Sequence, residues 1–161
     1  PQSFIGPADY FTLLRNYALS HRLRDEQGRV LPWIDENLNP LTGDWIARTR
    51  LKSWKDGTWD AGKGGVERGK DYNHSTYCDL VISGLIGLRP RADATVEVNP
   101  LVPQGWASFC LDQVPYHGHL LTILWDRTGQ RYGRGRGLRV LADGREIAAA
   151  DRLMRIEGKL P

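Results

Sequence analysis

The chain has 161 residues, of which 40% are hydrophobic and 25% are charged. This composition is typical of one soluble domain or two small ones, and it excludes a fibrous repeat or a disordered tail. The net charge of +3 is too small to indicate a nucleic-acid or membrane partner by itself.

The first predicted element is a helix from about Ala8 to Leu23, because apolar residues recur there at three- and four-residue spacing. We expect it to stop before Gly28. Residues 28–73 are rich in Gly and Pro and keep no clear period. A loop this long within a compact protein is often functional, and we interpret it so.

The second predicted helix begins at His74 and runs to Leu88, with Asn73 or Ser75 as its cap. Its sequence is almost entirely apolar, which predicts a buried helix packed closely against others through Gly84 and Gly87. The Arg-Pro pair that follows is expected to end it.

After residue 90 the hydrophobic pattern changes to the period of two that is typical of strands. The predicted strands are 95–98, 107–111, 120–125, 137–141 and 145–148. Asp143 and Gly144 form a typical two-residue hairpin turn between the last two. The predicted fold class is therefore α+β, with helices in residues 1–89 followed by an antiparallel β-sandwich in residues 90–161.

Two adjacent carboxylates, Asp35 and Glu36, lie between Trp33 and Trp45. Sugar-processing sites combine carboxylates for acid–base chemistry with flat aromatic rings that stack on the apolar faces of pyranoses. The alternative is structural: Trp33 lies in a core, Trp45 begins a helix, and both acids are solvated.

Residues 56–71 combine glycines with three basic side chains. The segment lacks the Lys-Ser/Thr ending and the preceding strand of a phosphate-binding loop, so we do not assign one. It is interpreted as a rim loop in which Trp59, Asp60 and Glu67 contact a polar ligand, or else as a plain surface loop.

His117 and His119 would share one face of a strand, a spacing that some metal sites use. No third ligand lies nearby in the sequence, so we predict no metal and no cofactor. Cys78 and Cys110 lack metal-site spacing and are expected to be reduced, buried thiols.

Five arginines and several glycines make up the segment from Arg127 to Arg139. Such tracts bind single-stranded nucleic acid in disordered proteins, and that function would show as a steep loss of affinity with salt. Because strong strand patterns flank it, a solvated hairpin edge is the favoured interpretation.

Three segments resemble the last part of inverting glycosidases of glycoside hydrolase family 63 and their mannosylglycerate-hydrolase-like relatives. They are Trp33-Ile-Asp-Glu-Asn-Leu-Asn-Pro-Leu-Thr-Gly43, Asp71-Tyr-Asn-His-Ser-Thr-Tyr-Cys-Asp-Leu-Val-Ile82 and Gly84-Leu-Ile-Gly-Leu-Arg-Pro90. The resemblance implies that the helices end an α/α toroid and that Arg-Pro introduces the β-sandwich. It also implies hydrolysis of α-linked sugars with Glu36 as the general base. Candidate sugar contacts are Trp33, Asp35, Trp45, Trp54, Trp59, Asp60, Glu67 and His74.

Inverting hydrolysis also needs a general acid, which lies far upstream in these relatives. The expected partners are therefore a carbohydrate and either an upstream catalytic half or another subunit, with no nucleic acid and no membrane. The first residues do not resemble a signal peptide, so we expect a cytoplasmic protein. The alternative function is a non-catalytic carbohydrate-binding or structural β-module.

Overall fold

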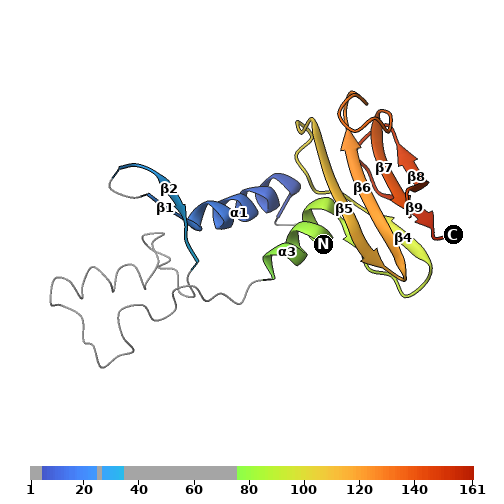
Figure 1. The fold of residues 1–161 in the computed structure, drawn as a ribbon, viewed down its shortest axis with the longest axis horizontal. Coiled ribbons are helices and arrows are strands. Elements are labelled where there is room, and N and C mark those ends of the chain that lie inside the picture. The colour runs from blue at the N-terminus through green and yellow to red at the C-terminus, as the bar shows by residue number, and fades with distance from the viewer. Residues whose placement is uncertain (1–4, 25–26, 35–75) are drawn as a thin grey trace. The chain divides into compact units, whose positions relative to one another are not determined.

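The computed structural model describes residues 5–24, 27–34 and 76–161 (Figure 1). The chain divides into two compact units. One comprises Pro1–Leu14 together with Tyr77–Pro161, and the other comprises Arg15–Thr76. Helix α1 (Pro7–Ser20) contributes residues to both. Nowhere in the described ranges is a helix both long enough and apolar enough to cross a membrane.

Helix α1 begins where the carboxylate of Asp9 accepts the backbone N–H of Gly6 at 3.0 Å. It ends three residues earlier than predicted, because β1 (Arg22–Arg24) leaves the helix and pairs with β2 (Val30–Pro32) in an antiparallel hairpin. The strand pairing satisfies backbone groups that a longer helix would have used.

The second predicted helix is shorter and more exposed than its sequence indicates. Within the described residues it consists of α3 (Tyr77–Asp79) and a π-helical segment η2 (Leu80–Ile86). Only its last residues are buried, and Leu80 is 44% exposed. The hydroxyl of Tyr10 in α1 donates to the Leu80 carbonyl at 2.9 Å. The helix ends at Gly87 and not at the Arg-Pro pair, because Gly87 is left-handed with φ 86° and donates to the Ile82 carbonyl.

Seven antiparallel strands form two sheets in the part of the chain from residue 88 onward. The three-stranded sheet has the order β3-β4-β9. The four-stranded sheet has the order β5-β6-β7-β8 (Figure 1). The strands of the first are β3 (Leu88–Arg89), β4 (Thr95–Val98) and β9 (Ile156–Lys159). Those of the second are β5 (Ser108–Tyr116), β6 (His119–Asp126), β7 (Gly137–Ala142) and β8 (Arg145–Ala150). This arrangement confirms the antiparallel β-sheet prediction and is consistent with a β-sandwich.

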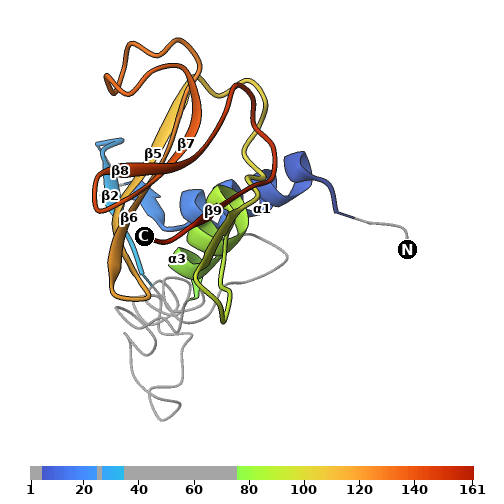
Figure 2. The ribbon, with the colours of Figure 1, turned by 90° about the vertical axis from the view of Figure 1, so that its right-hand side faces the viewer.

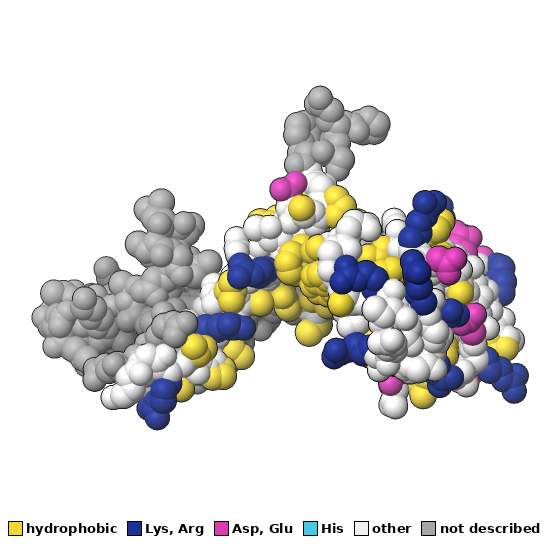
Figure 3. Space-filling model, turned by 90° about the horizontal axis from the view of Figure 1, so that it is seen from above, with side chains coloured by type: hydrophobic (Ala, Val, Ile, Leu, Met, Phe, Trp, Pro, Cys, Tyr) yellow, Lys and Arg dark blue, Asp and Glu magenta, His cyan; other side chains and the backbone are white. Residues whose placement is uncertain are grey.

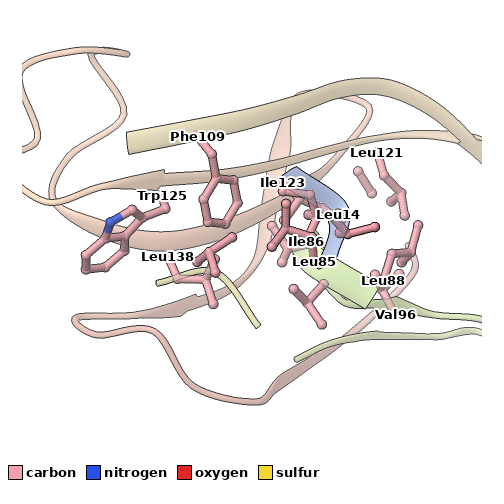
Figure 4. Close-up of a cluster of buried hydrophobic side chains, with 14 residues drawn as sticks. Leu14, Leu85, Ile86, Leu88, Val96, Phe109, Leu121, Ile123, Trp125 and Leu138 are labelled. Carbon is pink, nitrogen blue, oxygen red and sulfur yellow. The ribbon is translucent and has the colours of Figure 1, made fainter. Parts of the chain in front are cut away.

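The core combines the inner faces of both sheets with three residues from the helices. Val96 from β4 and Leu121, Ile123 and Leu138 from β6 and β7 are at most 1% exposed. Leu14 of α1 and Leu85 and Ile86 of η2 pack into the same cluster (Figure 4). The sandwich core is therefore completed by residues that precede its first strand.

Two of the sheet connections are tight two-residue turns. Asp143 and Gly144 have φ of 50° and 79° and join β7 to β8, which confirms the predicted hairpin. His117 and Gly118 join β5 to β6 in the same way, with φ of 47° and 82°. His117 therefore lies in a turn and not on the predicted strand face.

Gly87 and Gly144 have similar φ but different surroundings. Substituting each by Ala therefore distinguishes the cost of backbone strain from the cost of steric overlap. A Cβ at Gly87 would lie 2.1 Å from the Asn99 carbonyl oxygen, whereas a Cβ at Gly144 would meet no atom within 4 Å. We expect Gly144→Ala to lower the free energy of unfolding by about 1–2 kcal/mol through left-handed strain alone. Gly87→Ala adds overpacking against backbone and should lower it by at least about 1 kcal/mol more.

Urea unfolding of the 161-residue chain, followed by circular dichroism, measures both changes. Equal destabilisation by the two substitutions would contradict the close approach of Gly87 to the 99–100 backbone.

Candidate functional site

The predicted general base, Glu36, and most of the predicted sugar-contact residues lie outside the described residues. These are Asp35, Glu36, Trp45, Trp54, Trp59, Asp60, Glu67 and His74. Trp33 is described: it directly follows β2, and its backbone N–H donates to the His21 carbonyl at 2.9 Å. The side chain of Trp33 is half-buried, and the neighbouring Ile34 is 48% exposed.

The most closely organised polar group in the described residues is the carboxylate of Asp126, at the end of β6. The residue is 1% exposed. Its Oδ1 accepts the backbone N–H groups of Thr128 and Gly129 at 3.1 and 2.8 Å. Its Oδ2 accepts those of Arg131 and Tyr132 at 2.7 and 3.1 Å.

Burial alone would raise the pKa of Asp126, but these four backbone donors outweigh that effect and lower the pKa to about 2. The carboxylate is therefore charged at neutral pH and holds the following segment in a fixed path. Sequence reasoning missed this role. The available signal was the segment Asp126-Arg-Thr-Gly129 at the end of an apolar strand, which favours a side-chain-to-backbone turn.

We call residues 127–136, which join β6 to β7, the arginine loop. It lies at the top of Figure 2, in orange, at the end of the sheet away from the two tight turns. Four arginines in it are exposed, and none of them forms an ion pair with any described residue: Arg127, Arg131, Arg134 and Arg136. Basic side chains are spread over the β-sandwich part of the space-filling view (Figure 3).

The fifth arginine of the segment, Arg139, has a structural role. It lies on β7, where its guanidinium pairs with Glu146 of β8 and donates from Nη2 to the Arg136 carbonyl at 2.9 Å. The segment was predicted as a solvated hairpin edge, but β6 and β7 are the two inner strands of their sheet. The arginine loop therefore connects two central strands. Its first half is hydrogen-bonded to Asp126 and its last residue to Arg139.

Charged side chains on and next to the three-stranded sheet form ion pairs with one another. Glu97 of β4, whose side chain is 14% exposed, accepts from Arg155 Nε at 2.9 Å and from Arg91 Nη1 at 3.0 Å. These two hydrogen bonds lower the pKa of Glu97. Arg91 and Arg155 are therefore already neutralised, in contrast to the exposed arginines of the arginine loop.

The two histidines have different hydrogen-bond partners. His117 is hydrogen-bonded through Nε2 to the Arg91 carbonyl at 2.9 Å, while His119 donates from Nδ1 to Asp143 at 2.7 Å. The Leu120 N–H and His119 lower the pKa of Asp143. The described residues contain no group of three His, Cys, Asp or Glu side chains that could hold a metal ion.

Both cysteines are free and exposed, so the prediction of buried thiols is wrong. Phe109 takes the inward position on β5 and is 7% exposed, which turns the adjacent Cys110 outward. Partial burial and the nearby Asp112 raise the pKa of Cys110.

Two comparisons with known proteins match this chain to parts of glycoside hydrolases and to a protein named as a sialidase. Residues 88–149 match the family described as "Glycosyl hydrolase family 65, C-terminal domain". The chain is also similar to a solved structure named "Sialidase", with 45% identity over 98% of this chain and a TM-score of 0.76. The chain spans 13% of the length of that protein. The two matches support a glycoside hydrolase C-terminal domain.

The Asp126 carboxylate provides a test of how the arginine loop is held. We expect Asp126→Asn to lower Tm at pH 7 by roughly 5 °C or more, because an amide nitrogen cannot accept the N–H groups bound to Oδ2. The folded-state pKa of about 2 lies below the ordinary 3.8. The carboxylate therefore stabilises the protein above about pH 4 and loses this effect as pH falls through about 2.

Thermal melts of the wild type and the variant should consequently converge between pH 4 and pH 2. Asp151→Asn, which removes an exposed carboxylate at the same end of the sheet, is the matched control and should leave Tm nearly unchanged. A Tm difference that persists at pH 2 would show that the Asp126 charge is not what holds the loop.

Proposed function

We propose that this chain is the C-terminal portion of a glycoside hydrolase that cleaves α-linked sugars with inversion of configuration. The observation that carries the proposal is the match of residues 88–149 to a glycosyl hydrolase C-terminal domain. The 45% identity to the sialidase-named structure over nearly the whole chain supports it. The finer assignment, to an enzyme like those of family 63, rests on the motif around Glu36.

In this proposal Glu36 is the general base that activates the attacking water. The motif Glu36-Asn-Leu-Asn-Pro-Leu-Thr-Gly43 supports this role by its resemblance to the base-bearing segment of those enzymes. Trp33, Trp45, Trp54 and Trp59 are the stacking platforms for sugar rings. Asp35, Asp60, Glu67 and His74 are the polar contacts.

The general acid is proposed to come from outside this chain. An inverting site needs two carboxyl groups about 6.5–9.5 Å apart, with water between the base and the sugar. The chain spans 13% of the sialidase-named protein. A catalytic half upstream, or another subunit, would then supply the acid, and α1 and α3 would be the last helices of its toroid.

The second candidate function is a non-catalytic carbohydrate-binding or structural β-module. The observation that favours it is the sandwich itself, whose core draws in Leu14, Leu85 and Ile86 and so holds the preceding helices. This function would be supported over the enzyme if the 161-residue chain binds a saccharide and no assembly that contains the chain hydrolyses it.

The catalytic role of Glu36 predicts a specific loss of turnover. In the active assembly, Glu36→Gln should reduce kcat by at least about 100-fold, since general-base catalysis contributes roughly 10²–10⁴. The thermal melt should not move, because the substitution keeps the side-chain volume. Asp35→Asn, one residue away, is the control and should reduce kcat much less.

The stereochemistry of the first product is the second measurement. With an α-linked substrate, ¹H NMR recorded during the first turnovers should show the β-anomer before mutarotation. Retention of the α-anomer, or full activity of Glu36→Gln, would disprove the assignment.

A further inference from the structure

We propose that the arginine loop binds the carboxylate groups of an acidic saccharide. The proposal goes beyond the catalytic assignment by adding a binding site on the sandwich and a ligand class. Its choice of a saccharide as ligand rests on the proposed function. The positive charge of the loop arginines does not depend on the proposed function.

The first argument is charge without a partner. Residues 127–142 contain five arginines and no acidic residue. Arg139 is engaged by Glu146 and the loop backbone, whereas Arg131, Arg134 and their two neighbours in the loop have no acidic partner among the residues described. Asp126 forms no ion pair with them, and its two oxygens accept backbone N–H groups of the loop.

Asp151 is an acidic residue at the same end of the sheet as the arginine loop. It is exposed and follows β8, where the backbone of Gly137 packs against it. Exposed Arg152 follows Asp151 directly, so the two residues together add no net charge to this end of the sheet. The end of the sheet therefore keeps the excess positive charge of the loop.

The second argument is preorganisation. Asp126 fixes the loop backbone through four N–H groups, and Thr128 adds a hydroxyl hydrogen bond to the same carboxylate at 3.2 Å. At the other side, Arg139 holds the Arg136 carbonyl at 2.9 Å. A ligand that binds this loop loses less affinity to ordering it than a ligand of a flexible arginine-rich segment would.

The third argument concerns the kind of anion. Guanidinium groups match the planar, two-oxygen geometry of carboxylates and bind them bidentately. The loop has one aromatic ring, the half-buried Tyr132, and the Arg131 guanidinium lies 5.7 Å from its centroid. One ring suffices to contact the apolar face of a sugar. Single-stranded nucleic acid, in contrast, is bound on successive aromatic platforms, which this loop lacks.

Calorimetric titration of the 161-residue chain with trigalacturonate tests the proposal, with carboxyl-reduced trigalacturonate as the neutral control. We expect the acidic sugar to bind at least about tenfold more tightly at low ionic strength. This preference should shrink strongly near 0.5 M NaCl, where charges are screened within about 4–5 Å.

Arg131→Gln combined with Arg134→Gln should weaken trigalacturonate binding by about tenfold, since each exposed charge pair contributes modestly. The control combines Arg15→Gln with Arg145→Gln, two exposed arginines outside the loop. It lowers the net charge equally and should bind like the wild type. Arg131→Lys with Arg134→Lys keeps the charge without the planar fork and should restore binding only in part. Thermal melts establish that each variant is folded.

Equal binding of the acidic and neutral sugars, or equal loss in the loop variant and its control, would overturn the proposal. So would tighter binding of a single-stranded oligonucleotide than of trigalacturonate. None of these results affects the catalytic role of Glu36, which is measured by turnover. Conversely, a kinetic result that contradicts Glu36 as the general base does not change the titration result. The two proposals can therefore fail independently.

Discussion

The buried carboxylate of Asp126 is the constraint on which the arginine loop depends. β6 is a central strand, and the side chains at its end are buried, so the charge at its last residue has little access to water. A buried charge needs hydrogen-bond donors, and here the backbone from Thr128 to Tyr132 supplies them. The loop must curl around the carboxylate to do so, and its arginine side chains are left in solvent. One internal charge thus sets both the path of the loop and the electrostatics of its surface.

At the end of the sandwich that holds the two tight turns, hydrogen bonds join the two sheets. The hydroxyl of Tyr116, on β5, accepts the Arg91 N–H at 3.0 Å and donates to the Thr95 carbonyl at 3.1 Å. Asp143 accepts the Leu120 N–H and thereby ties the β7–β8 turn to the start of β6. Polar contacts at the turn end are thus satisfied within the domain, whereas the arginine loop keeps unpaired cations. The two ends of the sheet therefore differ in the partners they offer.

The sequence predicted those parts of the fold whose signals are local. Alternating residues marked five of the strands, and Asp143-Gly144 specified its turn. β9 was missed because its four residues include one large apolar side chain, Ile156, and it exists through pairing with distant β4. Asp126 was missed because its donors are backbone groups, whose positions depend on the loop path and not on residue type. The Glu36 site rests on a motif resemblance, and its residues remain predictions.

The shared core has a consequence for the order in which the protein folds. Leu14 belongs to the same cluster as Leu121 and Leu138, so the complete cluster requires strands that are synthesised more than a hundred residues later. Such distant contacts slow folding, because a long loop must close before burial compensates for the lost entropy. During synthesis this cluster is therefore incomplete until β6 and β7 emerge from the ribosome. This chain should thus depend more on chaperones during synthesis than a sandwich whose core is contiguous in sequence.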